Sequence, residues 1–316
     1  MTAKETEFKI AILDDYQKVA LQMADWSPLQ SRASIEVFSD ALTDPDDLVA
    51  CLRPFDVICV MRERTPLPRS IIERLPQLKL IVSTGPKNDS IATEAAEERG
   101  IVVKNTHGSL TAPIELTWAL IMASARHVVS EATSVRAGGW QQKVGDELRG
   151  KTLGVLGLGR IGGKIARIAQ AFDMHVITWS DRTTKEEADG LGATLVTKDQ
   201  LFAEADVLTI HLVLVEATRN LIGAAELAQM KPTSWLINTS RGPIVNEDAL
   251  IQALQSNRIG GAALDVFNTE PLPANHPFRT LPNVLATPHL GYVSSQQYEV
   301  YYSDTVASIG AWLDDR

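Results

Sequence analysis

Three regularly spaced glycines mark the stretch of this 316-residue chain that is best suited to bind phosphate groups. Gly157, Gly159 and Gly162 follow the apolar run 153–156 and precede a segment with helical spacing of apolar residues. In this context the first glycine permits a tight turn, the second lets a pyrophosphate approach the backbone, and the third lets a helix pack against a strand. Phosphate oxygens would meet unpaired N–H groups and the positive end of the helix dipole. A purely structural turn is the alternative, but the strand and helix on either side favour a dinucleotide site.

Three charged side chains lie downstream of these glycines, each shortly after an apolar segment that predicts a strand. They are Arg241, Glu270 and His289. Because the carboxyl ends of parallel strands meet at one edge of a sheet, we expect these side chains to converge there. Each of them alone is typical of a turn or a surface loop. Their joint occurrence after the glycine pattern indicates a catalytic site.

This combination of groups suits hydride transfer between a nicotinamide and a 2-keto acid. Arg241 can hold a carboxylate and polarise a carbonyl through its planar fork. His289 can exchange a proton with the carbonyl oxygen, and Glu270, if bonded to the imidazole, would fix its tautomer and favour its charged form. Asp265 can accept a hydrogen bond from the nicotinamide carboxamide. We interpret the remaining histidines as structural: His107, His127, His175, His211 and His276.

The end of the second strand after the glycines decides which dinucleotide fits. A carboxylate about 20 residues past the glycines would bond the adenosine ribose hydroxyls. If Asp181 takes this position, the sequence predicts NAD. If Ser180 takes it, with Arg182 just beyond, a 2′-phosphate can be held and NADP is predicted. The sequence leaves both readings open.

The first part of the chain also alternates strand and helix patterns, and two of its loops can bind a substrate carboxylate. One is the loop 84–88, in which Gly85 exposes backbone N–H groups beside Thr84 and Pro86, and Lys87 adds positive charge. The other carries Arg62 and Arg64. Solvated turns are the alternative interpretation of both arginines.

Composition excludes several classes of partner. The net charge of −9 argues against a nucleic acid or an anionic membrane surface as the main partner. Cys51 and Cys59 are too few for a metal site or a disulfide framework, so we expect no metal. The longest apolar run, 116–125, is too short to span a bilayer, and the N-terminal residues have no apolar signal core. We therefore expect a cytoplasmic protein.

The pattern of the whole chain predicts an α/β protein with two domains and mainly parallel sheets, and an active site in the cleft between the domains. The nearly all-round apolar segment 113–126 predicts a helix buried between domains or against a second subunit. The predicted strands are 8–13, 35–38, 55–61, 78–83, 101–104, 153–156, 175–179, 194–196, 207–212, 234–238, 262–266 and 284–287.

Four motifs, GLGRIG, NTSRGPIVNEDAL, AALDVFNTEPLP and TPHLGY, resemble those of the D-isomer-specific 2-hydroxyacid dehydrogenase family. The resemblance extends over nearly the whole chain. It implies an NAD(P)-binding Rossmann domain, residues 107–290, inserted in a flavodoxin-like substrate domain made of residues 1–106 and 291–316. It also implies a homodimer formed around the cofactor domain and an NAD(P)-dependent enzyme that acts on a small 2-keto acid.

The same resemblance assigns roles to individual residues. The catalytic Arg, Glu and His of the family fall on Arg241, Glu270 and His289, its pyrophosphate turn on Arg160–Ile161, and its substrate loop on 84–88. Its nicotinamide-binding Asp falls on Asp265. Further cofactor contacts are assigned to Thr239 and Gly291.

One departure and two rivals remain at this stage. The usual acid of the family after the second strand aligns with Ser180, as in the NADP-using glyoxylate/hydroxypyruvate reductases. A D-3-phosphoglycerate dehydrogenase is the nearer rival, and its phosphate would need the cations Arg62, Arg64 and Lys87. A nicotinamide-sensing, corepressor-like binding protein is the rival from another class.

Overall fold

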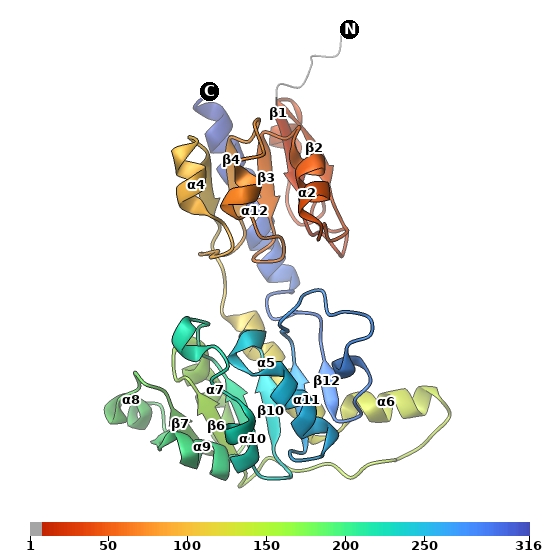
Figure 1. Ribbon diagram of the computed structural model, residues 1–316, viewed down its shortest axis with the longest axis vertical. Helices are drawn as coiled ribbons and strands as arrows, with labels where there is room; N and C mark the ends of the chain where they lie inside the picture. Colours follow the sequence, from red (N-terminus) through yellow and green to blue (C-terminus); the bar gives the residue numbers. More distant parts are fainter. Residues whose placement is uncertain (1–7) are drawn as a thin grey trace. The chain divides into compact units, whose positions relative to one another are not determined.

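The computed structural model describes residues 8–316, and their contacts divide into two compact units. Unit 1 comprises the described residues up to Ser109 together with Val293–Arg316, and unit 2 is Leu110–Tyr292. Unit 2 is therefore inserted in the sequence of unit 1 (Figure 1). Both units are α/β, as the sequence predicts. Every predicted strand is present, with its ends within two residues of the expected positions.

The described part of unit 1 has a five-stranded parallel sheet in the order β2-β1-β3-β4-β5. This is the flavodoxin-like order, so that prediction is confirmed. Its strands are β1 (Phe8–Ile12), β2 (Ala33–Val37), β3 (Val57–Val60), β4 (Leu80–Ser83) and β5 (Val102–Asn105). Its helices are α1 (Ser27–Gln30), α2 (Pro45–Leu52), α3 (Arg69–Ile72), α4 (Thr93–Glu98) and α12 (Ser295–Asp314).

The last helix, α12, returns to unit 1 and packs there through aromatic side chains. The rings of Trp312 and of Phe8 in β1 pack edge to face, with their centroids 5.3 Å apart. The ring centroids of Tyr302 and Trp26 are 6.3 Å apart. Strands β3 and β4 are buried along their whole length. Such continuous apolar runs are typical of parallel strands covered on both faces.

Unit 2 contains a seven-stranded parallel sheet in the order β12-β11-β10-β9-β6-β7-β8. Read from β8, this is the doubly wound Rossmann order with one further strand. Its strands are β6 (Thr152–Leu156), β7 (His175–Trp179), β8 (Thr194–Leu195), β9 (Val207–Ile210), β10 (Trp235–Asn238), β11 (Gly261–Leu264) and β12 (Val284–Ala286). Its helices are α5 (Thr111–Ala125), α6 (Val128–Arg136), α7 (Arg160–Ala171), α8 (Lys185–Gly190), α9 (Lys198–Glu204), α10 (Ala224–Gln229) and α11 (Glu247–Gln255).

Two apolar clusters cover the two faces of the unit 2 sheet. Neighbouring residues of one strand belong to different clusters, as Leu156 and Val155 of β6 and Leu236 and Ile237 of β10 do. This follows from the alternation of side chains along a strand. The sheet is thus fixed on both faces, and its strand ends hold the loops that carry the candidate site.

The apolar helix α5 is covered by its own unit. Ile114, Trp118 and Ile121 are buried in the cluster that contains Val155 and Ile237 of the sheet. The expectation that this helix needs another domain or a second subunit to cover it is therefore wrong for its buried face.

None of the helices in residues 8–316 combines the length and the apolar character needed to cross a lipid bilayer.

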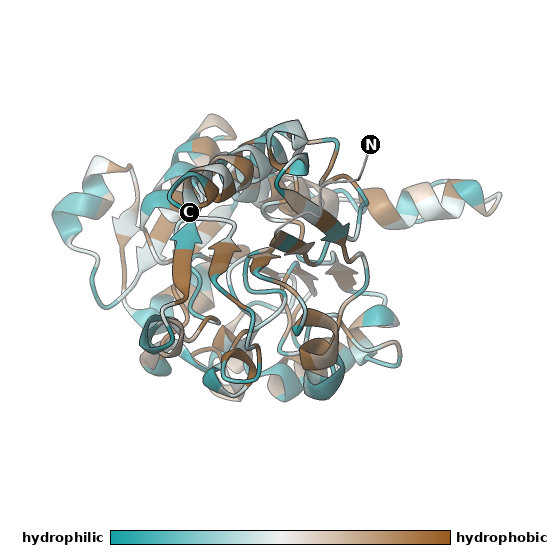
Figure 2. Ribbon diagram, turned by 90° about the horizontal axis from the view of Figure 1, so that it is seen from above, coloured by the Kyte–Doolittle hydropathy of each residue, from teal (hydrophilic) through white to brown (hydrophobic). Residues whose placement is uncertain are grey.

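Helix α6 was not expected from the sequence, and it contributes no residue to the core. None of its residues is buried, and His127 separates it from α5 with a left-handed backbone, φ 53°. It extends away from the rest of unit 2, as Figure 2 shows. Apolar side chains of α6 and of the segment after it are exposed. Val129 is 50% exposed, and Trp140 is 73% exposed.

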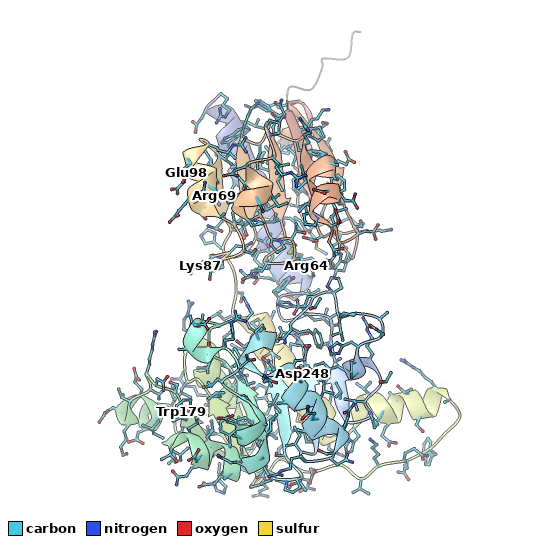
Figure 3. All side chains as sticks on the ribbon, in the orientation of Figure 1. Arg64, Arg69, Lys87, Glu98, Trp179 and Asp248 are labelled. Atoms are coloured by element: carbon cyan, nitrogen blue, oxygen red, sulfur yellow. The ribbon has the colours of Figure 1, made fainter. Side chains whose placement is uncertain are left out.

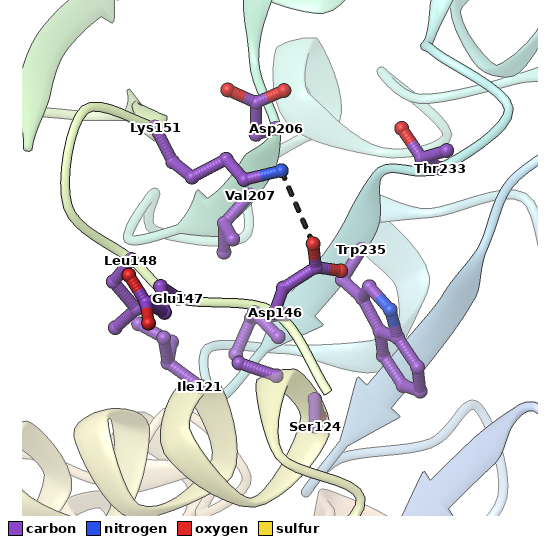
Figure 4. A pocket seen from close by; sticks show the side chains of 12 residues that line it. Ile121, Ser124, Asp146, Glu147, Leu148, Lys151, Asp206, Val207, Thr233 and Trp235 are labelled. Atoms are coloured by element: carbon purple, nitrogen blue, oxygen red, sulfur yellow. Dashed lines mark hydrogen bonds and ion pairs between the residues drawn. The ribbon is translucent and has the colours of Figure 1, made fainter. Parts of the chain in front are cut away.

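A small cavity of about 30 Å³ lies at the amino-terminal edge of the unit 2 sheet, lined by Lys151, Asp206 and Trp235 among others (Figure 4). It has room for about one water molecule, so it is too small for a keto acid or a dinucleotide. The buried hydroxyl of Ser124 lines it, with no hydrogen-bond partner among residues 8–316. The cavity is a packing feature at the edge opposite to the glycine loop.

Asp206 joins three segments at this edge. Its carboxylate accepts from Thr152 N–H at 2.8 Å and from Lys231 Nζ at 2.7 Å. Burial raises the pKa of Asp206, but Lys231 and the Thr152 N–H outweigh this effect and hold the pKa below its usual value. The ionised side chain therefore stabilises the start of β6 and of β9.

We expect Asp206→Asn to lower the free energy of unfolding by about 1 kcal/mol at pH 7, because the ion pair with Lys231 is lost. The folded-state pKa is lowered, so this stabilisation is complete above the unfolded pKa of about 3.9 and is lost as pH falls through the folded value. Denaturant unfolding between pH 7 and pH 3 tests this. Asp199→Asn, at an exposed site in α9, is the control and should change stability by less than about 0.5 kcal/mol.

Candidate active site

The glycine loop joins β6 to α7 at the carboxyl-terminal edge of the unit 2 sheet. Gly157 has φ +97°, and a Cβ there would lie 3.0 Å from His211 O. A Cβ on Gly162 would lie 2.1 Å from Gly157 O, so close packing of helix and strand requires this glycine. A Cβ on Gly159 would meet nothing within 4 Å. The space in front of Gly159 is therefore open, which fits a backbone that a pyrophosphate must approach.

Helix α7 begins directly at this open space. Its first residues are Arg160 and Ile161, and its cap residue Gly159 is extended, with no side chain to bond the first N–H groups. Unpaired N–H groups and the helix dipole attract an anion at such a terminus. The start of α7 therefore has the geometry expected of a pyrophosphate turn, and the contact of Arg160 and Ile161 with a phosphate stays a prediction.

The end of β7 presents Ser180 next to the glycine loop. Gly157 N–H donates to the carbonyl of Trp179, the last residue of β7, at 3.1 Å. Ser180 Oγ lies 2.7 Å from Thr183 Oγ1 and accepts from Thr183 N–H at 3.2 Å. This bonding closes a turn in which Asp181 and Arg182 are exposed. Trp179 is labelled in Figure 3.

The loop after β10 carries Arg241 and is held by several local hydrogen bonds. Asn238 Nδ2 donates to Arg241 O at 3.0 Å, and Ser240 Oγ donates to Leu212 O at 2.5 Å. Thr239 Oγ1 lies 2.8 Å from the hydroxyl of Thr117 in α5. Contacts with Leu212, just after β9, and with Thr117 of α5 thus hold the backbone that carries Arg241.

Asp265 is fully buried after β11 and organises the loop that follows β12. Its Oδ1 accepts from Thr287 Oγ1 at 2.6 Å and from Leu290 N–H at 2.7 Å, and its Oδ2 accepts from Gly291 N–H at 2.8 Å. Burial raises the pKa of Asp265 above its usual value, although these donors and His289 act in the opposite direction. A carboxylate has about four acceptor positions, so a bond from the nicotinamide carboxamide stays a prediction.

His289 and Glu270 form a hydrogen-bonded pair in unit 2. Nδ1 of His289 lies 2.6 Å from Oε2 of Glu270, and Glu270 Oε1 accepts from Phe267 N–H at 2.9 Å. Because an ionised carboxylate only accepts, Nδ1 carries the proton and Nε2 is left for a substrate. His289 has a left-handed backbone, φ 54°, which is uncommon for a residue other than glycine and is held by the loop around Asp265.

The charge state of Glu270 supports this assignment of the proton. Burial raises the pKa of Glu270, but the hydrogen bond and charge of His289, the Phe267 N–H and the charge of Arg241 outweigh it, and the pKa lies below its usual value. Glu270 is therefore ionised at neutral pH. It stabilises a positive charge on the imidazole next to it.

In unit 1 the predicted substrate loop is closely bonded to the loop after β3. Thr84 N–H donates to Val60 O, and Gly85 N–H donates to the hydroxyl of Thr106 at 2.8 Å. These two N–H groups are thus engaged within unit 1. Among residues 8–316, no protein acceptor is bonded to the N–H groups of Lys87 and Asn88, so these two can bind an anion.

Arg62 crosses this loop. A Cβ on Gly85 would lie 1.8 Å from Nη1 of Arg62, so the guanidinium occupies the space above this glycine. Arg62 N–H also donates to Thr84 Oγ1 at 2.9 Å, and Asn88 Nδ2 donates to Arg62 O at 2.6 Å. Lys87 and Arg64 lie at the same edge of the unit (Figure 3). Arg62, Thr84, Gly85, Pro86 and Lys87 are thus neighbours, and their contact with a substrate stays a prediction.

One supporting contact has no signal in the sequence. His276 Nε2 lies 3.4 Å from Oε1 of Glu247, the first residue of α11, and Nδ1 accepts from Phe278 N–H. Glu247 Oε2 also accepts from Asn268 N–H at 3.4 Å. The pair therefore ties the loop that carries Glu270 to α11. No spacing rule could reveal it, because the two residues are far apart in sequence.

No cluster of three metal-ligating side chains occurs within residues 8–316.

Comparison with known proteins identifies similar sequences and structures. The family model described as D-isomer specific 2-hydroxyacid dehydrogenase, NAD binding domain, matches residues 118–291. A hydroxypyruvate reductase from Thermotoga maritima is 37% identical over 290 residues, which are 90% of this chain and 91% of that protein. A D-3-phosphoglycerate dehydrogenase from Synechocystis sp. is 38% identical over 305 residues, 96% of this chain. The match covers 53% of that protein, so the chain spans about half of its length.

A solved structure, described as a phosphoglycerate oxidoreductase from Vibrio cholerae, has a TM-score of 0.93 and 39% identity to this chain. The alignment covers 98% of this chain and 100% of that structure. The similarity therefore includes both units and is not restricted to the dinucleotide fold.

The glycine loop gives a matched pair of variants. Gly162→Ala should lower the melting temperature by several degrees, because its Cβ would clash with Gly157 O and this costs about 1–3 kcal/mol. Gly159→Ala should leave the melting temperature within about 1 °C and weaken dinucleotide binding about tenfold, because a methyl group would occupy the space of the pyrophosphate. Thermal unfolding and calorimetric titration measure the two effects. Unchanged binding by Gly159→Ala would remove the loop from the dinucleotide site.

Proposed function

The chain belongs to the D-isomer specific 2-hydroxyacid dehydrogenase family, and from this premise we propose that it is an enzyme that transfers a hydride between NAD(P)H and a 2-keto acid. The observation that carries the proposal is the bonded pair of His289 and Glu270, with Nδ1 and Oε2 2.6 Å apart. The pair follows strands of the same parallel sheet as the glycine loop. The proposed acid–base group and the proposed phosphate-binding turn therefore belong to one sheet edge.

His289 supplies the proton in this proposal. Glu270 accepts from Nδ1 and stabilises the imidazolium, so Nε2–H can donate to the carbonyl oxygen of the keto acid as that oxygen gains negative charge. In the opposite direction neutral Nε2 accepts the proton of the 2-hydroxy group. Glu270 stays ionised in both directions and acts by positioning and charge.

Arg241 is proposed to bind the substrate carboxylate. Its planar guanidinium can form two parallel hydrogen bonds to a carboxylate and add positive charge beside the carbonyl. The bonds of Asn238 and Ser240 to neighbouring backbone hold the loop in place. The loop is therefore preorganised, which keeps the reacting groups aligned.

The dinucleotide supplies or accepts the hydride. We propose that Gly157, Gly159, Gly162 and the N–H groups of Arg160 and Ile161 hold its pyrophosphate. The open space in front of Gly159 and the uncapped start of α7 support this. Asp265, Thr239 and Gly291 are proposed to line the nicotinamide end.

For the ribose, we propose a preference for NADP(H). Ser180 is the first residue after β7, and the exposed Arg182 follows in the same turn. A serine hydroxyl and a guanidinium suit a 2′-phosphate, whereas NAD selection needs a carboxylate in that first position. Asp181 is exposed one residue later and is the rival residue.

The substrate is proposed to be a small 2-keto acid such as glyoxylate or hydroxypyruvate. The N–H groups of Lys87 and Asn88, next to Arg62, are proposed to bind its carboxylate together with Thr84, Gly85 and Pro86 as the wall of the loop. The alternative is a D-3-phosphoglycerate dehydrogenase, which would use the same loop with a phosphate-bearing substrate.

A homodimer and a cytoplasmic location are part of the same proposal. Helix α6 and the segment after it expose apolar side chains, including Val128, Val129, Val135, Trp140 and Val144. A second copy of the chain is the proposed cover for this surface. The cytoplasmic location comes from the sequence and stays a prediction.

His289→Ala should lower kcat for keto-acid reduction about 10²–10⁴-fold, because the proton donor is lost. Oxidation of NADH and of NADPH, followed by absorbance with a panel of 2-keto acids, measures this. His175→Ala is the control, because His175 is exposed at the opposite edge of the sheet. A near-normal kcat would exclude His289 as the acid–base group. Tight dinucleotide binding without turnover by the unaltered protein would favour the sensor function.

Arg182→Ala should lower kcat/KM for NADPH about tenfold and leave kcat/KM for NADH within about twofold, because only NADPH carries the 2′-phosphate. Asp181→Ala is the matched variant and should not reduce the use of NADPH. If the unaltered protein uses NADH alone and Asp181→Ala impairs it, the ribose is bound by Asp181 and the NADP preference is wrong.

A further inference from the structure

Glu63 lies beside the proposed substrate loop of unit 1 and is paired with Arg62. Nη2 of Arg62 is 3.3 Å from Oε1 of Glu63. The two side chains are only 18% and 26% exposed. A pair that is largely shielded from water exerts a stronger electrostatic effect on its surroundings than a surface pair does.

The position of Arg62 brings this acid to the loop. Nη1 of Arg62 lies 3.5 Å from Thr84 O and 3.4 Å from Lys87 O, and the guanidinium covers Gly85. The other end of the same guanidinium meets Glu63. A ligand bound at the N–H groups of this loop is therefore close to a carboxylate as well as to a guanidinium.

The other two cations at this edge are also engaged. Lys87 Nζ lies 2.7 Å from Oδ1 of Asp89. Arg64 Nη1 donates to Asp14 O at 2.7 Å, and its guanidinium lies over the Tyr16 ring at 4.4 Å. The three cations that a phosphate would need thus each face an acid, a carbonyl or an aromatic ring.

We propose that Glu63 selects against substrates that carry a second anionic group, so that the chain acts on 2-keto acids with an uncharged side chain. This inference rests on the proposed reductase function and narrows its substrate class. Glu63 reduces the net positive charge that Arg62 offers to the loop. One carboxylate can still bind through the N–H groups of Lys87 and Asn88, whereas a phosphate dianion near Glu63 meets like charge.

Hydroxypyruvate and 3-phosphohydroxypyruvate provide the test, because they differ only in the phosphate. The ratio of their kcat/KM values is measured for the unaltered protein, Glu63→Gln and Glu63→Asp. The unaltered protein should favour hydroxypyruvate about 100-fold. Glu63→Gln should move the ratio about tenfold toward the phosphorylated substrate, because the like charge is removed. Glu63→Asp keeps the charge and should leave the ratio within about threefold.

The ratio separates charge selection from a structural role, since a structural defect lowers both kcat/KM values alike. Glu98→Gln, which removes an exposed acid paired with Arg69 in the same unit, should leave the ratio unchanged. If the unaltered protein uses the phosphorylated substrate equally well, or if Glu63→Gln leaves the ratio unchanged, the inference is wrong and the reductase function stands. If the unaltered protein reduces no 2-keto acid, the proposed function and this inference both fail.

Discussion

The candidate site of unit 2 depends on the buried carboxylate of Asp265. This one side chain, at the end of β11, accepts hydrogen bonds from Thr287, Leu290 and Gly291 in the loop after β12. Three donors to a fully buried carboxylate stabilise a loop conformation that the backbone alone would disfavour. His289, in the middle of that loop, has φ 54°. These hydrogen bonds thus hold the imidazole of His289 in a fixed position although its backbone conformation is unfavourable.

Two carboxylates of the same region have different tasks because their surroundings differ. Asp265 is surrounded by donors of the loop and is closed to solvent, so it acts on the backbone. Glu270 is partly exposed and bonds the ring of His289, so it acts on the proton. In the proposed function Glu270 has the acid–base role, while Asp265 holds the loop that carries His289, a division that burial and hydrogen bonding produce in many active sites.

The sequence predicted what depends on local pattern. The glycine spacing and the strands follow from short-range rules and are present. Helix α6 was missed because it buries nothing, so the hydrophobic pattern carries no signal for it. The bond between His276 and Glu247 was missed because it joins residues 29 positions apart. Side-chain pairing is a property of the folded chain, and residue types alone do not contain it.

The same limit explains why a motif can identify a reaction more readily than a substrate. The proposed reacting groups follow strand ends, and the parallel sheet fixes their positions once the strands are recognised. Specificity depends on the net charge that a loop presents, which is set by pairing. In the sequence alone, Arg62 and Lys87 are two cations suited to a phosphate. In the folded unit each has an acid within ion-pair distance, Glu63 and Asp89. Counting cations therefore overstates the positive charge, and the partners of each cation decide which anion can bind.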